Sequence, residues 1–205
     1  MMKPDWQLKA PIDTIIFDCD STLTRLEGID ELARYNNVGD TVARMTAQAM
    51  STSGMNPDLF KARLELIKPT YKQMKQLSLD YFNHRSLDVI EMLEILKKLE
   101  KNIFIVSSGL NPSVTDFGKQ LHIPAENIFA VNLKFSADGT YLDFDHSSPL
   151  IQRDGKRTIV AEIKKTHPRI VYIGDGMNDL EATDLCERFI GYGGVEYRHH
   201  IAERC

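Results

Sequence analysis

Three short apolar runs, each ending abruptly in polar residues, dominate the hydrophobic pattern of the chain. Short runs of β-branched and aromatic residues predict buried strands, and the polar residues behind them predict loops. The three pairs of run and loop are residues 14–17 with 18–22, 103–106 with 107–109, and 170–173 with 174–176. Buried strands that alternate with amphipathic helices indicate a parallel sheet with helices on both faces. In such a sheet the functional groups lie at the carboxyl ends of the strands.

The segments between these runs carry helical signals and one hairpin signal. Val89, Leu93 and Leu96 recur at helical spacing ahead of residues 103–106. Pro112 behind Asn111 is typical of a first-turn proline that follows a capping residue. Residues 133–144 place an Ala-Asp-Gly-Thr segment between alternating apolar positions, which predicts a β-hairpin.

One long segment, residues 25–84, shows no convincing strand. Helical spacing recurs there in three groups, and Asn-Pro and Lys-Pro pairs at residues 56–57 and 68–69 punctuate it. The groups are Ile29, Leu32 and Ala33; Val42, Met45 and Ala49; and Phe60, Leu64 and Ile67. Because this segment directly follows the first strand's polar loop, we expect a small α-helical cap inserted over the functional edge. The predicted division is a core of residues 1–24 and 87–205 and a cap of residues 25–86.

The composition narrows the class of protein. The 205 residues are 42% hydrophobic, enough to bury a core without disulfides or structural metals, and the formal charge is −4. A mildly acidic chain without a long basic run argues against a nucleic-acid partner. Residues 1–11 contain no long apolar stretch, so we expect neither a signal peptide nor a membrane partner. The three widely spaced cysteines favour the reduced cytoplasm. The oligomeric state stays open.

Acidic residues follow two of the predicted strands. Asp18 and Asp20 come directly after residues 14–17, and Asp175 follows residues 170–173. Carboxylates this close repel one another unless a cation or a shared proton intervenes. Hard oxygen ligands suit Mg²⁺, which prefers a few carboxylates together with water and phosphate oxygens. The pattern therefore predicts a magnesium site that receives a phosphate.

Two further segments offer groups that bind phosphate. Ser107, Ser108 and Gly109 supply hydroxyl and backbone N–H donors at a strand end. Lys156 stands just before a predicted helix that carries Ile159, Val160 and Ile163. Each feature alone is common at turns or at the start of helices. They indicate phosphate binding only in combination with the acidic residues. Arg198, His199 and His200 form a surface patch that could suggest a metal or partner site, but adjacent histidines such as these are expected to be solvated.

These motifs stand together in the order of a known superfamily. Residues 18–22 (DCDST), Ser107, Lys156 and residues 174–179 (GDGMND) resemble the four motifs of the haloacid dehalogenase superfamily. The chain is similar to its phosphoserine phosphatase family from about residue 13 to 198, including the cap segment EGIDELA at residues 27–33. The resemblance implies a Rossmann-like α/β core with an inserted helical cap, Mg²⁺ as cofactor, and a small phosphorylated metabolite, phosphoserine, as substrate.

The resemblance also implies roles for the core residues. Asp18 would attack phosphorus and form an aspartyl-phosphate, and Asp20 would act as the general acid and then the general base. Mg²⁺ would be held by the Asp18 carboxylate, the Asp20 carbonyl and Asp175, with Asp179 orienting these ligands from behind. The phosphoryl group would be bound by Ser107, Ser108, Gly109, Lys156 and Asn178.

In the cap, the resemblance places three residues at the substrate's amino-acid end. Glu27 would face its ammonium and Arg63 its carboxylate, with Met50 beside them. The chain departs from the family pattern near that end, at Ser51, Thr52, Asn56, Ser108 and Leu110. Phosphatase chemistry is therefore the firmer expectation, and phosphoserine specificity the weaker one. The chain also ends at Cys205, before the family's usual final helix, which leaves open an uncovered core edge or a shortened chain.

Alternative activities would need other residues at the motif positions or share part of the same chemistry. A dehalogenase needs neither an acid at the position of Asp20 nor a metal, and a P-type pump needs Lys at that position and long membrane segments. Transfer of the phosphoryl group to another alcohol, such as homoserine, shares the first half-reaction and stays open. So do phosphothreonine and phosphohomoserine as substrates. A non-catalytic binding module is disfavoured because Asp18, Asp20 and Lys156 are all present.

Overall fold

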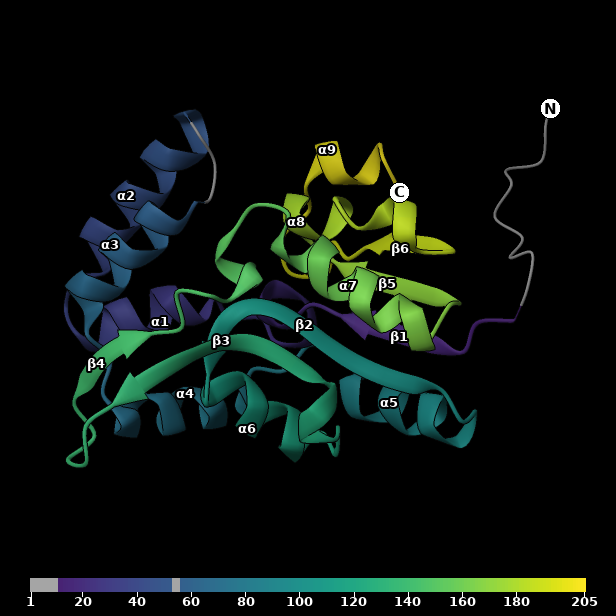
Figure 1. The fold of residues 1–205 in the computed structure, drawn as a ribbon, viewed down its shortest axis with the longest axis horizontal. Helices are drawn as coiled ribbons and strands as arrows, with labels where there is room; N and C mark the ends of the chain where they lie inside the picture. Colours follow the sequence, from purple (N-terminus) through teal and green to yellow (C-terminus); the bar gives the residue numbers. More distant parts are fainter. Residues whose placement is uncertain (1–10, 53–55) are drawn as a thin grey trace.

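A six-stranded sheet forms the centre of the molecule in a computed structural model that describes residues 11–52 and 56–205, without the side chains of residues 47–52. The strand order is β4-β3-β2-β1-β5-β6; β4 pairs antiparallel with β3, and all other neighbours pair parallel (Figure 1). The strands are β1 (Thr14–Phe17), β2 (Asn102–Asn111), β3 (Ile128–Phe135), β4 (Tyr141–Phe144), β5 (Ile170–Gly174) and β6 (Arg188–Gly191). The predicted α/β fold with a parallel core is confirmed, and β3 with β4 forms the predicted hairpin.

Helices cover both faces of this sheet, as expected for parallel strands joined by right-handed crossovers. Figure 1 shows α5 (Val89–Lys98) and α6 (Ser113–Gln120) on one face, and α7 (Gly155–Thr166) and α8 (Met177–Leu180) on the other. On α6, Val114 and Phe117 are fully buried. Gly118 lies so close to the sheet that a Cβ there would stand 2.5 Å from a methyl group of Ile128. The short helix α9 (His199–Ala202) follows β6.

Two sequence boundaries were wrong by a few residues. β2 does not end at Val106 but continues to Asn111, because Leu110 and Asn111 still pair with β3 after a shift of register. Residues 107–109, predicted as a loop, therefore form an irregularity inside a strand. Lys156 does not precede its helix but lies in the first turn of α7. The four-residue elements β6 and α9 carried too little periodicity to be predicted.

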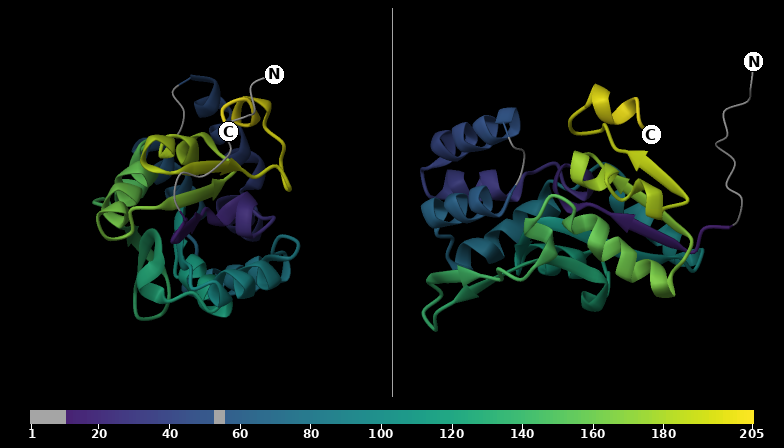
Figure 2. Two further views of the ribbon diagram at one scale, coloured as in Figure 1. Left: turned by 90° about the vertical axis from the view of Figure 1, so that its right-hand side faces the viewer. Right: turned by 45° about the horizontal axis from the view of Figure 1, so that its top comes forward.

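The segment predicted to be helical folds into four helices between β1 and α5. They are α1 (Gly28–Tyr35), α2 (Gly39–Thr52), α3 (Pro57–Ile67) and α4 (Tyr71–Asn83). The Asn-Pro signal marks the start of α3, where the Asn56 side chain accepts a hydrogen bond from the Leu59 amide at 2.9 Å. Thr70 and Gln73 form a capping box at the start of α4. Figure 2 shows α1, α2 and α3 stacked at one end of the molecule.

The fourth of these helices is anchored to the core. Met74, Leu77 and Tyr81 of α4 are fully buried, and the Ser113 hydroxyl of α6 donates to the Met74 carbonyl at 2.8 Å. The rings of Tyr81 and Phe117 lie 5.6 Å apart in an edge-to-face contact. α4 therefore packs the four-helix segment against the helix layer that covers one face of the sheet. Throughout residues 11–52 and 56–205, no helix combines the length and the apolar character needed to cross a bilayer.

Candidate active site

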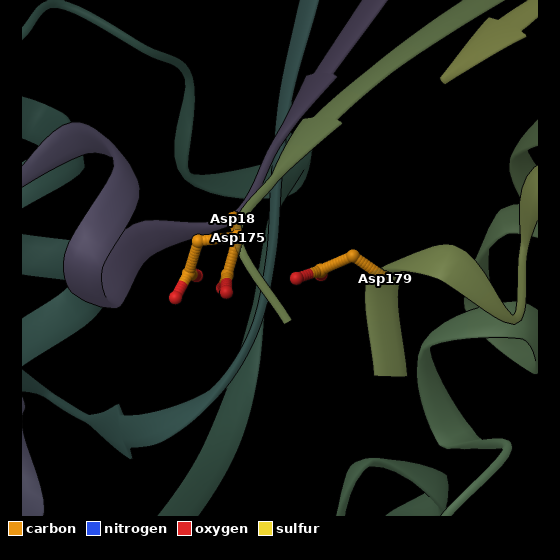
Figure 3. A group of neighbouring side chains, drawn as sticks. All are labelled: Asp18, Asp175 and Asp179. Carbon is orange, nitrogen blue, oxygen red and sulfur yellow. The ribbon is translucent and has the colours of Figure 1, made fainter. Parts of the chain in front are cut away.

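Three buried carboxylates meet at the carboxyl ends of β1 and β5. These strands pair in register up to Phe17 and Ile173, so Asp18 and Asp175 leave the sheet at neighbouring points. In Figure 3 their side chains lie side by side, and Asp179 points toward them from α8. Carboxylate oxygens of the three residues lie within 4.8 Å of one another. Parallel strands bring these acids together although 157 positions separate Asp18 from Asp175.

Lys156 is the cation that bridges two of these acids. Its ammonium nitrogen lies 2.7 Å from Asp18 and 2.6 Å from Asp179, and the Lys156 side chain is only 4% exposed. Burial disfavours a charged lysine, but the charges of Asp179 and Asp18 outweigh this and raise the pKa of Lys156. Asp179 is held further by the Tyr172 hydroxyl at 2.7 Å and the Gly176 amide at 3.0 Å. The α7 helix thus delivers a fixed positive charge to the acid cluster.

The acids outnumber the bases in the pocket above this cluster. Among the described residues, a cavity of about 410 Å³ is lined by seven carboxylate and three basic side chains. Burial, and next the charge of Asp179, raise the pKa of Asp18 well above its usual range. Asp18, Asp175 and Asp179 together are a hard oxygen donor set. Such a set fits a divalent cation of the Mg²⁺ or Ca²⁺ type rather than a soft metal.

The irregular segment of β2 supplies the opposite wall of the cavity. Ser107 is buried, and its hydroxyl accepts a hydrogen bond from the Gly109 amide at 2.9 Å. A Cβ on Gly109 would stand 3.0 Å from both the Ser107 hydroxyl and a methyl group of Val114. Glycine at this position lets the backbone approach closely, which suits the recognition of a phosphate by main-chain donors.

The cap side of the cavity carries charges of both signs. Glu27, just ahead of α1, accepts a hydrogen bond from the Ser21 hydroxyl at 2.6 Å and is exposed to solvent through the pocket. Desolvation of the carboxyl group by the surrounding protein, and next the charge of Asp20, raise the pKa of Glu27 to about 8. Arg63 of α3 is only 4% exposed, and its guanidinium donates to the Thr46 hydroxyl at 3.4 Å. Burial raises the pKa of Asp30 on α1, and the positive charge of Arg63 opposes this rise.

Comparisons with known proteins agree with this arrangement. The family of haloacid dehalogenase-like hydrolases matches residues 15–184. "Phosphoserine phosphatase" of Homo sapiens is 36% identical over 193 residues, which cover 93% of this chain and 86% of the relative. The chain belongs to the phosphoserine phosphatase family of haloacid dehalogenase-like hydrolases. The family member from Bos taurus is 35% identical with the same coverage. A solved "phosphoserine phosphohydrolase-like protein" from Francisella tularensis has a TM-score of 0.81 at 27% identity, covering 94% of this chain and 92% of that one.

Nearly all residues that the sequence proposed for this family's site line one cavity. Only the Met50 side chain falls outside the described part of the chain. The site residues that meet in the cavity are Asp18, Asp20, Glu27, Arg63, Ser107, Ser108, Gly109, Lys156, Asp175, Asn178 and Asp179. They come from the sheet with its covering helices and from the helical segment between β1 and α5, so the cavity lies where these two parts meet.

Sequence reasoning missed one basic residue of the site in this family member. Arg198 was given no role from the sequence, but its guanidinium donates to the Asp175 carbonyl at 2.9 Å and also contacts the Asp175 carboxylate. It donates as well to Glu196 at 2.6 Å. No local sequence pattern identifies Arg198 as a site residue. It lies 23 positions after Asp175 and reaches it only through the fold of the chain beyond β6. His200 and Glu196 line the same cavity.

Proposed function

We propose that this chain hydrolyses O-phospho-L-serine to L-serine and phosphate through an aspartyl-phosphate on Asp18. The observation that carries the proposal is the pairing of two charge patterns in one cavity. Buried Asp18 beside Lys156 and Ser107 forms a phosphate end, and Glu27 with Arg63 forms an end for an ammonium and a carboxylate. The names of the relatives agree with this substrate. The reduced cytoplasm remains the proposed setting, on the strength of the cysteine pattern.

At the phosphate end, each carboxylate has its own task. One Asp18 oxygen accepts from the Cys19 amide at 2.7 Å and the other from Lys156, so the attacking group is fixed in orientation. Asp18 displaces the serine oxygen, and Asp20 donates a proton to that leaving oxygen. Asp20 then takes a proton from the water that hydrolyses the aspartyl-phosphate. Burial raises the pKa of Asp20, which favours the protonated form that a general acid needs.

Mg²⁺ is the cofactor that the acid cluster fits best. The Asp18 carboxylate, the Asp20 carbonyl and Asp175 would hold it, and Asp179 would keep these ligands in place from behind. When bound, the ion offsets the repulsion between the Asp18 carboxylate and a phosphate dianion. Lys156 and Ser107 would bind phosphoryl oxygens directly.

Two other pocket residues complete the phosphoryl contacts. Asn178 lines the cavity from the first turn of α8, and we assign it to the placement of the phosphate. Ser108 would add a backbone N–H donor from the irregular part of β2, and the Gly109 amide, which donates to the Ser107 hydroxyl in this structure, would turn to the phosphate when it binds.

At the other end, the cap segment would select the substrate. We assign residues 25–86 to this cap, with Arg63 on the substrate carboxylate and Glu27 on its ammonium. A planar guanidinium can grip a carboxylate with two parallel hydrogen bonds, which a lysine cannot. Met50 would border the same end.

A phosphate-release screen with Mg²⁺ tests the proposal. We expect phosphoserine to exceed phosphothreonine, phosphohomoserine and sugar phosphates in kcat/KM, and Asp18→Asn to abolish turnover in a folded protein. Preference for another phosphoester would contradict the substrate, and activity of Asp18→Asn would contradict the mechanism. Adding homoserine separates hydrolysis from transfer, because a transferase would form phosphohomoserine at the expense of free phosphate.

A further inference from the structure

The carboxyl group of Asp20 lies between the first turn of α1 on one side and β2 on the other. Its Oδ2 atom accepts a hydrogen bond from the Gly28 amide, the first residue of α1, at 2.9 Å. Its Oδ1 atom faces the β2 wall, 3.7 Å from where a Cβ of Gly109 would stand. The two oxygens of Asp20 therefore have different surroundings. Oδ2 is held by the Gly28 amide, and Oδ1 is buried against the β2 wall.

A tyrosine hydroxyl from α4 lies at the same place. Tyr81 is fully buried, and a Cβ on Gly28 would stand 1.9 Å from its hydroxyl oxygen. Only glycine at position 28 lets the first turn of α1 lie this close to Tyr81. Because the Gly28 amide also binds Asp20, the Tyr81 hydroxyl and the Asp20 carboxyl share one small buried space.

The polar atoms in this space have no competing partners. Neither the Tyr81 hydroxyl oxygen nor Asp20 Oδ1 makes a hydrogen bond of standard geometry with any residue that the structure describes. Burial raises the pKa of Asp20, while the Tyr81 hydroxyl is the next largest influence and acts in the opposite direction. A buried hydroxyl without a partner destabilises the fold, so a neighbouring carboxyl is its natural acceptor.

We propose that Tyr81 is a positioning residue whose hydroxyl donates to Asp20 Oδ1 while the Gly28 amide holds Oδ2, so that the Asp20 carboxyl is fixed in orientation for proton transfer. The inference rests on the proposed function, in which Asp20 is the general acid. As the P–O bond to serine breaks, the proton of the Asp20 carboxyl passes to the serine oxygen and Asp20 becomes a carboxylate. The two donors from the cap then stabilise that carboxylate.

The variant Tyr81→Phe tests this with three substrates, because kcat/KM reports the steps up to phosphorylation of Asp18. Phosphoserine and phosphoethanolamine release alkoxides that need a proton, whereas p-nitrophenyl phosphate releases a stable phenolate. General-acid catalysis contributes about 10²–10⁴-fold, and we expect loss of its positioning to cost roughly ten- to thirtyfold on the first two substrates. On p-nitrophenyl phosphate the change should stay within about twofold, because little proton transfer is at stake there.

A matched control is Tyr141→Phe. Tyr141 is also a buried tyrosine whose hydroxyl lacks a standard hydrogen bond among the described residues, but it lies on β4 and does not line the cavity. It should behave like wild type on all three substrates. Equal losses of Tyr81→Phe on all three, or no loss on phosphoserine, would overturn the proposal. A loss on phosphoserine but not on phosphoethanolamine would overturn it too, because it would place Tyr81 at the carboxylate end.

A second measurement does not depend on the leaving group. Gly28→Ala should impair folding or activity in the wild-type background, because its Cβ meets the Tyr81 hydroxyl. In the Tyr81→Phe background that atom is gone, and the nearest ring carbon would stand 3.0 Å away, so part of the loss should return. Equal effects of Gly28→Ala in both backgrounds would show that the hydroxyl does not occupy this space. Failure of the proposed function is distinguishable, because wild-type protein would then release no phosphate from phosphoserine.

Discussion

Replacing Lys156 by methionine should lower the free energy of unfolding, because the buried carboxylates of Asp18 and Asp179 then lose their shared cation. Lys156 is the common partner of Asp18 and Asp179, at 2.7 and 2.6 Å, and the three side chains are 4%, 9% and 0% exposed. Methionine keeps most of the side-chain volume but removes the charge. Removing one partner of a buried ion pair costs about 3–5 kcal/mol, since it leaves an uncompensated buried charge. For a chain of this length that is a fall in Tm of roughly 6–20 °C.

Urea unfolding followed by circular dichroism, in buffer with a chelator, measures this loss without a contribution from bound metal. The control is Lys165→Met on the same helix. Lys165 pairs with Glu162 at 2.6 Å, but the two side chains are 67% and 64% exposed. Exposed pairs of this kind contribute less than about 1 kcal/mol. If the two variants lost the same free energy of unfolding, the assignment of Lys156 as an essential counter-charge would be refuted.

The same variant has a defined pH dependence. Burial and the charge of Asp179 already raise the pKa of Asp18 with Lys156 in place, so without the lysine Asp18 binds a proton more readily in the folded state than in the unfolded state. The free energy of unfolding of Lys156→Met should therefore rise as the pH falls from 7 toward 5. The penalty relative to wild type shrinks over that range. A penalty that stays constant would show that lost packing, and not charge, is its source.

Three further predictions concern the substrate and the metal. Arg63→Ala should lose a charge-assisted contact of about 1.5–3 kcal/mol, which is roughly ten- to a hundredfold in kcat/KM for phosphoserine. The loss should be small for p-nitrophenyl phosphate, which has no carboxylate. Comparable losses on both substrates would indicate a packing role. Exhaustive chelation should stop phosphate release, with recovery in Mg²⁺ but not in Ca²⁺, whose longer bonds and larger ligand number suit the site less well for in-line attack; activity that survives chelation would rule out the metal role. Arg198→Met should lower the Mg²⁺ concentration for half-maximal activity roughly three- to tenfold, because the guanidinium and the ion compete for Asp175, whereas a higher concentration would show that Arg198 orients Asp175 for the ion.

The part of the site that follows directly from strands was predictable from sequence. Asp18 stands one residue, and Asp175 two residues, behind a recognisable apolar run, and parallel pairing in register makes their proximity a consequence of the fold. The extent of β2 was not predictable. Its continuation to Asn111 depends on pairing with β3, a partner more than twenty residues away, and that pairing shifts around Ser107 and Gly109.

The contacts that sequence reasoning missed are those made between elements by single side chains. Arg198 reaches Asp175 from beyond β6, and Tyr81 of α4 packs against Gly28, whose amide binds Asp20. A lone arginine near a terminus or a tyrosine on an apolar helix face has no local signature of such a role. Both are buried or half-buried because of packing that periodicity does not specify.

The two aspartates of the first motif are close in sequence but are held by different parts of the fold. Asp18 is held by the Cys19 amide and by Lys156 from α7, all within the predicted core. After one intervening residue the chain turns, with Ser21 at a left-handed φ of 52°, and Asp20 faces the Gly28 amide and Tyr81 of the cap segment. In the proposed mechanism, the attacking group therefore depends on the core and the proton donor on the cap. A change in cap packing can then alter the leaving-group dependence of the reaction while the acid cluster around Asp18 stays intact.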